Sequence, residues 1–161
     1  LFRSLSDYVS RKLWTPMHAE ESALWSLDRK DGMEKAYCCF NSNARDFARF
    51  GQLLLNNGQW DDRQLISPAY LAEATSPDTR LVYKDLGKPN HCYGFQYWIL
   101  DYKGMKIPYM RGILGQYVFT LPEKNAVIVR LGHKRSDTYT ADQHYPDDIN
   151  TWLDAAMDLL Q

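Results

Sequence analysis

The stretch that decides the fold is residues 116–131, which read QYVFTLPEKNAVIVRL. Two apolar runs, residues 116–121 and 126–131, flank the turn-forming sequence Pro122-Glu123-Lys124-Asn125. Two short apolar runs on either side of a turn are typical of adjacent antiparallel strands. This stretch therefore predicts a β-hairpin, which forms part of a larger sheet if its neighbours in the sequence follow the same pattern.

The residues before this hairpin do follow it. Residues 93–100 are strand-like, residues 101–104 have the composition of a hairpin connection, and residues 107–110 form another strand candidate. Together with the hairpin, these segments predict an antiparallel sheet of about three to four strands.

Four helices are predicted around the sheet. The first starts at a Ser4 or Ser6 cap and ends at Thr15-Pro16, and the second and clearest covers residues 43–57. Ser67-Pro68 begins the third, which ends at Ser76-Pro77, and the last covers residues 148–160. Helices, then an antiparallel meander, then a closing helix predict an α+β fold class with helices flanking the sheet.

Length and composition agree with one compact domain. The chain has 161 residues, of which 45% are hydrophobic and 14% aromatic, so it contains enough apolar area to fold. No apolar run approaches the roughly 18–20 residues of a membrane-spanning helix. A formal net charge of −1 argues against an electrostatic interaction with nucleic acid or anionic lipid.

The metal-binding patterns are missing as well. No two of the four histidines stand three to five residues apart, and no cofactor-binding motif occurs, so we expect no metal site and no cofactor. Cys38, Cys39 and Cys92 are too few and too unevenly spaced for a zinc ribbon or a disulfide framework. We expect these cysteines to serve in packing.

The residues of this chain do not form a complete catalytic set. A Ser-Lys acyl-transfer enzyme needs Ser-x-x-Lys, and none of the serines is followed by Lys three residues later. Tyr8-Val9-Ser10 matches the Y-x-S/N pattern that often accompanies Ser-Lys, but it falls inside the first amphipathic helix. We interpret Tyr8 as a core residue.

The chain begins with Leu1-Phe2-Arg3, almost directly followed by an amphipathic pattern and without an initiator Met. We therefore expect it to be cut from a longer protein, whose targeting signal would lie outside this sequence. The residues themselves leave the localisation unknown.

Several blocks, in order, resemble the serine β-lactamase-like hydrolases, which include class C β-lactamases, penicillin-binding esterases and 6-aminohexanoate-dimer hydrolases. Residues 34–51 resemble the family segment written G-G-x-x-x-x-x-x-D-x-A-R-F-G, and residues 115–132 resemble its last core hairpin. The other matching blocks are residues 4–16, 65–68 and 93–98.

The resemblance implies that residues 1–161 are the C-terminal portion of one β-lactamase-like domain. In the family the nucleophilic Ser, its Lys partner and the catalytic Tyr precede the matching region. The parent would hydrolyse an amide, an ester or a β-lactam through an acyl-enzyme, and this chain alone would be inactive.

The resemblance also implies the site residues. The family's K-T-G or H-x-G motif corresponds to residues 111–116, where the Ile113 backbone N–H would donate to the oxyanion and Arg111 would replace the family's Lys. Gly112 and Gly115 would allow close approach of the substrate next to Gln116, or alternatively would shape a β-bulge. Asn41 would lie at the rim of the substrate cleft, or alternatively would cap the helix that begins near Asn43.

Two functions stay open at this point. One is a fragment of a serine hydrolase that takes a small-molecule substrate. The other is a non-catalytic binding or oligomerisation module derived from the same fold. A truncated domain would expose an apolar patch beside residues 112–116, through which a homo-oligomer could form. The two functions differ in whether the gene continues upstream into Ser-x-x-Lys.

Overall fold

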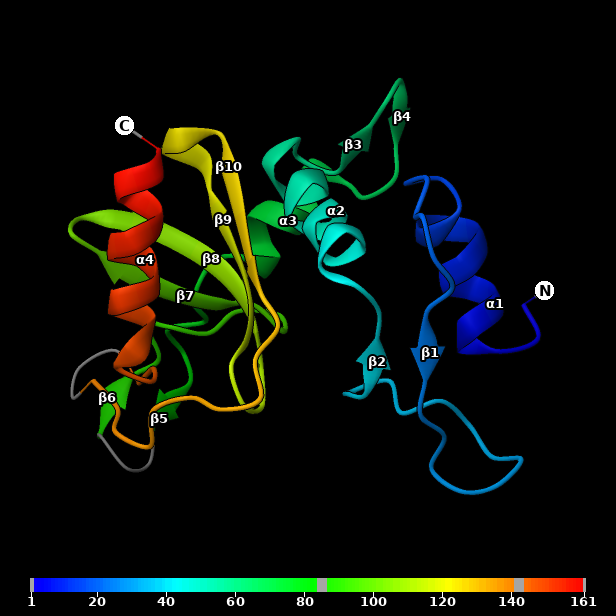
Figure 1. Ribbon diagram of the computed structural model, residues 1–161, viewed down its shortest axis with the longest axis horizontal. Helices are drawn as coiled ribbons and strands as arrows, with labels where there is room; N and C mark the ends of the chain where they lie inside the picture. Colours follow the sequence, from blue (N-terminus) through cyan, green and yellow to red (C-terminus); the bar gives the residue numbers. More distant parts are fainter. Residues whose placement is uncertain (1, 84–86, 141–143, 161) are drawn as a thin grey trace.

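The computed structural model describes residues 2–83, 87–140 and 144–160, and its centre is a four-stranded antiparallel sheet (Figure 1). The strands lie in the order β10-β9-β8-β7. Their bounds are β7 Trp98–Tyr102, β8 Met105–Gly112, β9 Gln116–Leu121 and β10 Ala126–Arg130. The short 3-10 helix η2, Pro122–Lys124, forms the turn of the predicted hairpin, in which Val127 pairs with Thr120.

The helix α4, Asp148–Leu159, covers one face of this sheet (Figure 1). Its Ile149 and Leu153 are fully buried in the main hydrophobic cluster. The sheet residues of that cluster alternate along the strands, as expected for side chains that share one face. They are Leu100, Tyr102, Ile107, Tyr109, Tyr117, Phe119 and Leu121.

The helix α2, Ala44–Leu55, packs on the opposite face, against β9 and β10. A Cβ atom at Gly51 would lie 2.5 Å from a methyl carbon of Val127 and 3.2 Å from one of Val118, so the helix backbone closely approaches the strands. Strand β9 is thus covered on both faces, which explains why residues 117–121 are all buried.

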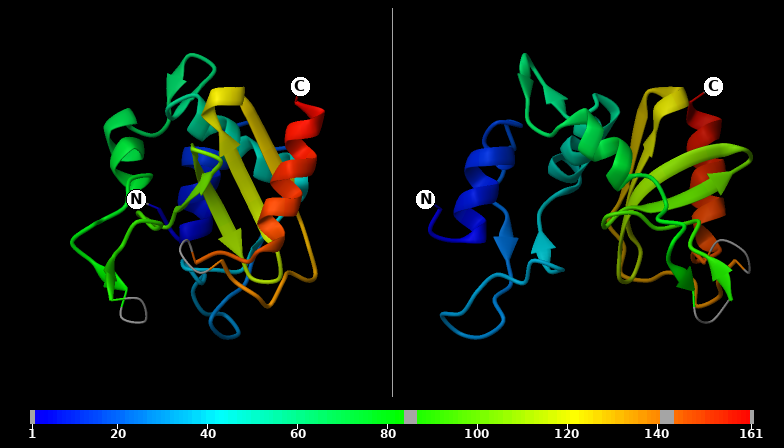
Figure 2. Two further views of the ribbon diagram at one scale, coloured as in Figure 1. Left: turned by 90° about the vertical axis from the view of Figure 1, so that its left-hand side faces the viewer. Right: turned by 180° about the vertical axis from the view of Figure 1, so that it is seen from behind.

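The N-terminal segment lies beside α2 and away from α4 (Figure 2). It contains α1 Leu5–Val9, the π-helix η1 Ser10–Trp14 and the short strands β1 Leu24–Trp25 and β2 Phe40–Asn41, which pair with each other. Trp14 and Trp25 both contact the Phe40 ring edge-on, with ring centroids 5.2 and 5.1 Å apart. This aromatic cluster joins the segment to Phe50 of α2.

The remaining elements are short. They are β3 Gln59–Trp60 paired with β4 Arg63–Gln64, α3 Pro68–Ala74, and β5 Val82–Tyr83 paired with β6 Lys88–Pro89. The Ser67 side chain caps α3, as the Ser67-Pro68 sequence predicts.

The α+β prediction is confirmed, and the main differences concern where elements begin. The strand expected over residues 93–100 begins only at Trp98, because Gly94 N–H bonds to the Tyr97 carbonyl and closes a turn. The first predicted helix changes from α to π at Ser10. Tyr8 is not a core residue, since 44% of it is exposed. No helix in the described part of the chain is long and apolar enough to cross a membrane.

Candidate functional site

The predicted site stretch forms the turn between β8 and β9. Gly112 is the last residue of β8 and pairs with Gln116, the first residue of β9, so Ile113, Leu114 and Gly115 make the connection. Leu114 and Gly115 have φ angles of 61° and 85°, the left-handed region that a tight hairpin connection requires. Both glycines therefore belong to the hairpin between β8 and β9, Gly112 at the end of β8 and Gly115 in the connection.

Ile113 lies at the exposed end of this turn. Ile113 is 78% exposed and Leu114 is 49% exposed. Within residues 2–83, 87–140 and 144–160, no protein group accepts a hydrogen bond from the Ile113 N–H. This amide is therefore available to donate to a molecule bound beside the turn.

Gly115 has a different role from the predicted one. It is buried, and a Cβ atom there would lie 1.8 Å from Nη1 of Arg130. Arg130 Nη1 donates to the Gly115 carbonyl over 2.6 Å, and Nη2 donates to the Lys134 carbonyl over 2.9 Å. The missing side chain thus makes room for Arg130, and this packing corrects the expectation that it makes room for a substrate.

Arg111 and Gln116 make specific contacts next to the turn. The Arg111 guanidinium lies 3.4 Å from the Trp98 ring centroid, and its Nη1 donates to the His144 carbonyl over 2.9 Å. Gln116 Nε2 donates to the Gly132 carbonyl. Both side chains are therefore oriented by the protein, while Nε and Nη2 of Arg111 donate to no group in the described ranges.

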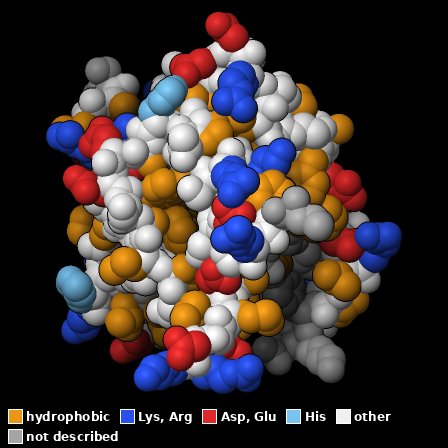
Figure 3. Space-filling model, turned by 90° about the vertical axis from the view of Figure 1, so that its right-hand side faces the viewer, with side chains coloured by type: hydrophobic (Ala, Val, Ile, Leu, Met, Phe, Trp, Pro, Cys, Tyr) orange, Lys and Arg blue, Asp and Glu red, His pale blue; other side chains and the backbone are white. Residues whose placement is uncertain are grey.

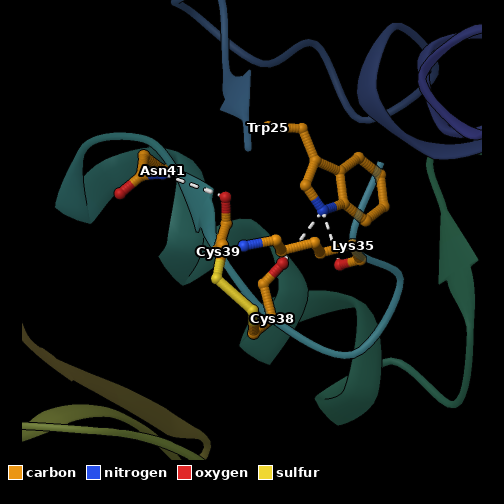
Figure 4. The surroundings of a disulfide bond; sticks show 5 residues. All are labelled: Trp25, Lys35, Cys38, Cys39 and Asn41. Atoms are coloured by element: carbon orange, nitrogen blue, oxygen red, sulfur yellow. Dashed lines mark hydrogen bonds between the residues drawn. A yellow bond between two sulfur atoms is a disulfide. The ribbon is translucent and has the colours of Figure 1, made fainter. Parts of the chain in front are cut away.

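Asn41 lies on β2, in the N-terminal segment. Its Nδ2 donates to the Cys39 carbonyl over 3.0 Å, and the residue is exposed (Figure 4). Asn43, and not Asn41, caps α2, because its Oδ1 accepts from the Asp46 N–H over 2.9 Å. Among the residues that the structure describes, no hydrogen bond joins Asn41 to the β8–β9 turn.

The cysteines correct a second expectation. Cys38 and Cys39 form a disulfide with each other, and Cys39 is exposed, so neither residue serves in packing (Figure 4). Cys92 alone is buried, with 1% of its surface exposed. Cys39 has a φ of 70° and lies directly before β2.

Asp46, at the N-terminus of α2, is a fully buried carboxylate. Burial alone would raise its pKa, but hydrogen bonds from the Glu20 and Glu21 N–H groups and from Asn43, with the positive charge of Arg49, outweigh burial and lower the pKa. Arg49 Nη1 lies 3.0 Å from the Asp46 carboxylate and Nη2 lies 3.0 Å from that of Glu20. Asp46 and Arg49 thus connect the N-terminal segment to α2.

A groove of about 660 Å³ runs along the N-terminal segment. Trp14, Trp25 and Phe40 contribute apolar surface to it, and His18 and Glu20 contribute polar groups. The face of the molecule that carries this segment is drawn in Figure 3, where charged side chains separate several apolar patches. None of residues 111–116 lines this groove. No group of three or more potential metal ligands gathers within the described ranges.

Comparison with known proteins gives a structural match. The sequence matches no family model, and no curated protein is significantly similar to it. Its structure is similar to a solved protein described as "Putative 6-aminohexanoate-dimer hydrolase from Bacillus anthracis", with a TM-score of 0.72 and 26% sequence identity. The match covers 98% of this chain and 38% of that protein. The chain thus has the fold of part of a hydrolase-like protein and spans less than half of that neighbour's length.

Proposed function

We propose that residues 1–161 are the C-terminal portion of a serine hydrolase domain of the β-lactamase-like class. In this proposal the chain supplies one wall of the substrate cleft, with the oxyanion donor on it, while residues outside the chain supply the nucleophile. The alternative is a non-catalytic binding or oligomerisation module of the same fold. The similarity to part of a hydrolase neighbour supports the catalytic proposal.

The observation that carries this proposal is the Ile113 amide. It lies at an exposed turn, has no partner among the described residues and needs no particular side chain to donate. When a serine attacks a carbonyl, negative charge develops on the carbonyl oxygen, and a fixed N–H beside that oxygen stabilises the transition state. Ile113 would supply that N–H, and a second donor would come from the nucleophile's own segment.

The substrate in this proposal is a small amide, ester or β-lactam. The exposed Ile113 side chain offers an apolar contact. Nε and Nη2 of Arg111, which have no partner in the described part of the chain, offer donors for a substrate carboxylate. No group among the described residues donates to the Asn41 Oδ1, which in this proposal accepts a hydrogen bond at the rim. Gly112 and Gln116 complete the surface beside the turn. Gly115 supports the turn, because its missing side chain leaves space for the Arg130 guanidinium.

The test uses the product of the whole reading frame that contains these residues, assayed with p-nitrophenyl acetate and nitrocefin. Ile113→Pro removes the N–H, whereas Ile113→Ala keeps it and removes most of the side chain. We expect the proline variant to lower kcat by about 10²–10³ and the alanine variant to lower it far less. Equal losses in the two variants would contradict an oxyanion role for this amide.

A second assay separates the two candidate functions. Residues 1–161 alone should turn over neither substrate above a heat-denatured control, because no Ser-Lys pair is present. Turnover by the isolated chain would contradict the proposal. A reading frame without Ser-x-x-Lys upstream of Leu1 would favour the non-catalytic module.

A further inference from the structure

The disulfide between Cys38 and Cys39 joins two adjacent residues, and this makes its role local. A disulfide stabilises a fold by closing a long loop, and its contribution falls as the loop becomes shorter. With a sequence separation of one, this bond closes no loop of the chain beyond a single peptide unit. It therefore does not hold the fold together, and its effect lies in the turn that contains it.

The carbonyls of the two cysteines are the groups that fix this turn. The Cys38 carbonyl accepts from Trp25 Nε1 over 3.0 Å, and the Cys39 carbonyl accepts from the Ser26 N–H over 3.0 Å. Asn41 Nδ2 also donates to the Cys39 carbonyl (Figure 4). The disulfide thus constrains the same peptide groups that attach the turn to β1 and orient Asn41.

Cys39 has an unusual backbone conformation, which the disulfide can maintain. Its φ of 70° lies in the left-handed region, which residues other than glycine rarely adopt. Without the ring formed by the disulfide, Cys39 is free to return to a negative φ, which would turn its carbonyl away from Ser26 and Asn41. The oxidised and reduced chains therefore favour different arrangements of these hydrogen bonds.

The bond is also reachable. Cys39 is exposed and Cys38 is half-buried, whereas Cys92, the remaining cysteine, is buried and therefore shielded from exchange. Exposed disulfides are the ones that exchange with thiols in solution.

We propose that Cys38–Cys39 is a reversible thiol–disulfide exchange site whose redox state sets the conformation of the turn before β2. A thiolate of a dithiol reductant attacks one cysteine sulfur, forming a mixed disulfide and releasing the other sulfur as a thiolate that takes up a proton. The second thiol of the reductant then displaces the first cysteine. Two electrons and two protons reach the protein, and the reductant leaves as a disulfide. This proposal does not depend on hydrolase activity.

The first experiment counts thiols in the folded chain. Air-oxidised protein is treated with dithiothreitol under native conditions, alkylated with N-ethylmaleimide and analysed by peptide mass spectrometry. We expect adducts on Cys38 and Cys39 only after reduction, and none on Cys92 until the chain is denatured. Free Cys38 and Cys39 thiols before reduction, or no adducts after it, would overturn the proposal.

The second experiment measures the turn itself. We expect reduction to change the tryptophan emission, with the change absent in Trp25→Phe and already present without reductant in Cys38→Ser/Cys39→Ser. The thermal midpoint should move by less than about 4 °C, because the bond closes no long loop. An emission unaffected by reduction, or a change that persists in Trp25→Phe, would show that the bond does not control this turn.

Discussion

At the scale of single residues, Gly115 shows how the β8–β9 turn is held in place by the packing of Arg130 against it. The Arg130 guanidinium occupies the space of a side chain at Gly115 and lies 4.5 Å from the Trp152 ring centroid. The β8–β9 turn is therefore attached to the end of β10 and to α4. This attachment holds the turn that contains the Ile113 backbone, while Ile113 itself is mostly exposed.

Gly115→Ala should destabilise the chain more than Gly104→Ala, which is a matched control. Both glycines have a φ of 85°, but a Cβ at Gly104 meets no atom within 4 Å. The alanine at position 104 should cost about 1–2 kcal/mol for its backbone conformation alone. The alanine at position 115 should cost at least about 1 kcal/mol more, because it displaces Arg130 from two carbonyls. Urea unfolding measures both, and equal losses would contradict this role of Arg130.

Asp46→Asn should destabilise the chain by about 2–4 kcal/mol near neutral pH, because Asp46 is a buried acceptor for two backbone N–H groups and for Arg49. The folded chain lowers the pKa of Asp46, so its stabilising effect is complete above the unfolded value of about 3.9 and is lost as the pH falls through the lower folded value. The difference in unfolding free energy between the unchanged chain and Asp46→Asn should therefore become smaller as the pH falls from 6 to 3.

Asp78→Asn is the control for that comparison. Asp78 forms an ion pair with Arg80, whose side chain is 86% exposed, so its removal should cost much less. Urea unfolding at the two pH values checks both variants. A stability difference for Asp46→Asn that stays constant with pH would contradict a depressed pKa.

At the scale of elements, the contact of α2 with the sheet depends on Gly51. A helix prefers alanine to glycine by about 1 kcal/mol, yet the close approach to Val127 leaves no room for a methyl group at this position. Glycine at this position therefore lowers the helix propensity of α2 but allows α2 to pack more closely on β9 and β10.

Gly51→Ala should accordingly destabilise the chain by about 1–3 kcal/mol despite its better helix propensity. Val127→Ala opens space opposite the new methyl group, so the double variant should lose less stability than the sum of the single variants. Unfolding free energies of the four proteins measure this coupling. A stabilising Gly51→Ala, or additive losses, would show that α2 does not pack as described.

Elements with strong local determinants could be predicted from the sequence. The apolar stripe placed α2 within two residues of its observed ends, and Ser67-Pro68 located the start of α3. The beginning of β7 could not be predicted, because Phe95 N–H bonds to the Ala74 carbonyl at the end of α3. The apolar pattern of residues 93–97 is the same whether or not that tertiary contact forms.

At the scale of the whole molecule, the sheet is covered by α2 on one face and α4 on the other, while the N-terminal segment is held by fewer buried side chains. Neither α1 nor η1 contains a buried residue. This distribution is consistent with a segment that packs against further protein in the proposed complete domain.

The part of the candidate site that depends on local sequence could be predicted, as could the elements of the fold with strong local determinants. Glycines after a strand locate the β8–β9 turn, but the occupant of the space at Gly115 depends on the pairing of Arg130 with Tyr117 across β10 and β9. A positive φ at Cys39 and the hydrogen bond from the Ser26 N–H to the Cys39 carbonyl accompany the Cys38–Cys39 bond. Such long-range contacts leave no local pattern in the sequence.

The most direct test of the proposed function is to locate the nucleophile. The product of the whole reading frame is labelled with a fluorophosphonate probe, and the adduct is mapped by peptide mass spectrometry. We expect a single adduct on a serine before Leu1 that is followed three residues later by lysine. An adduct within residues 1–161, or a folded protein that takes up no label, would contradict the account.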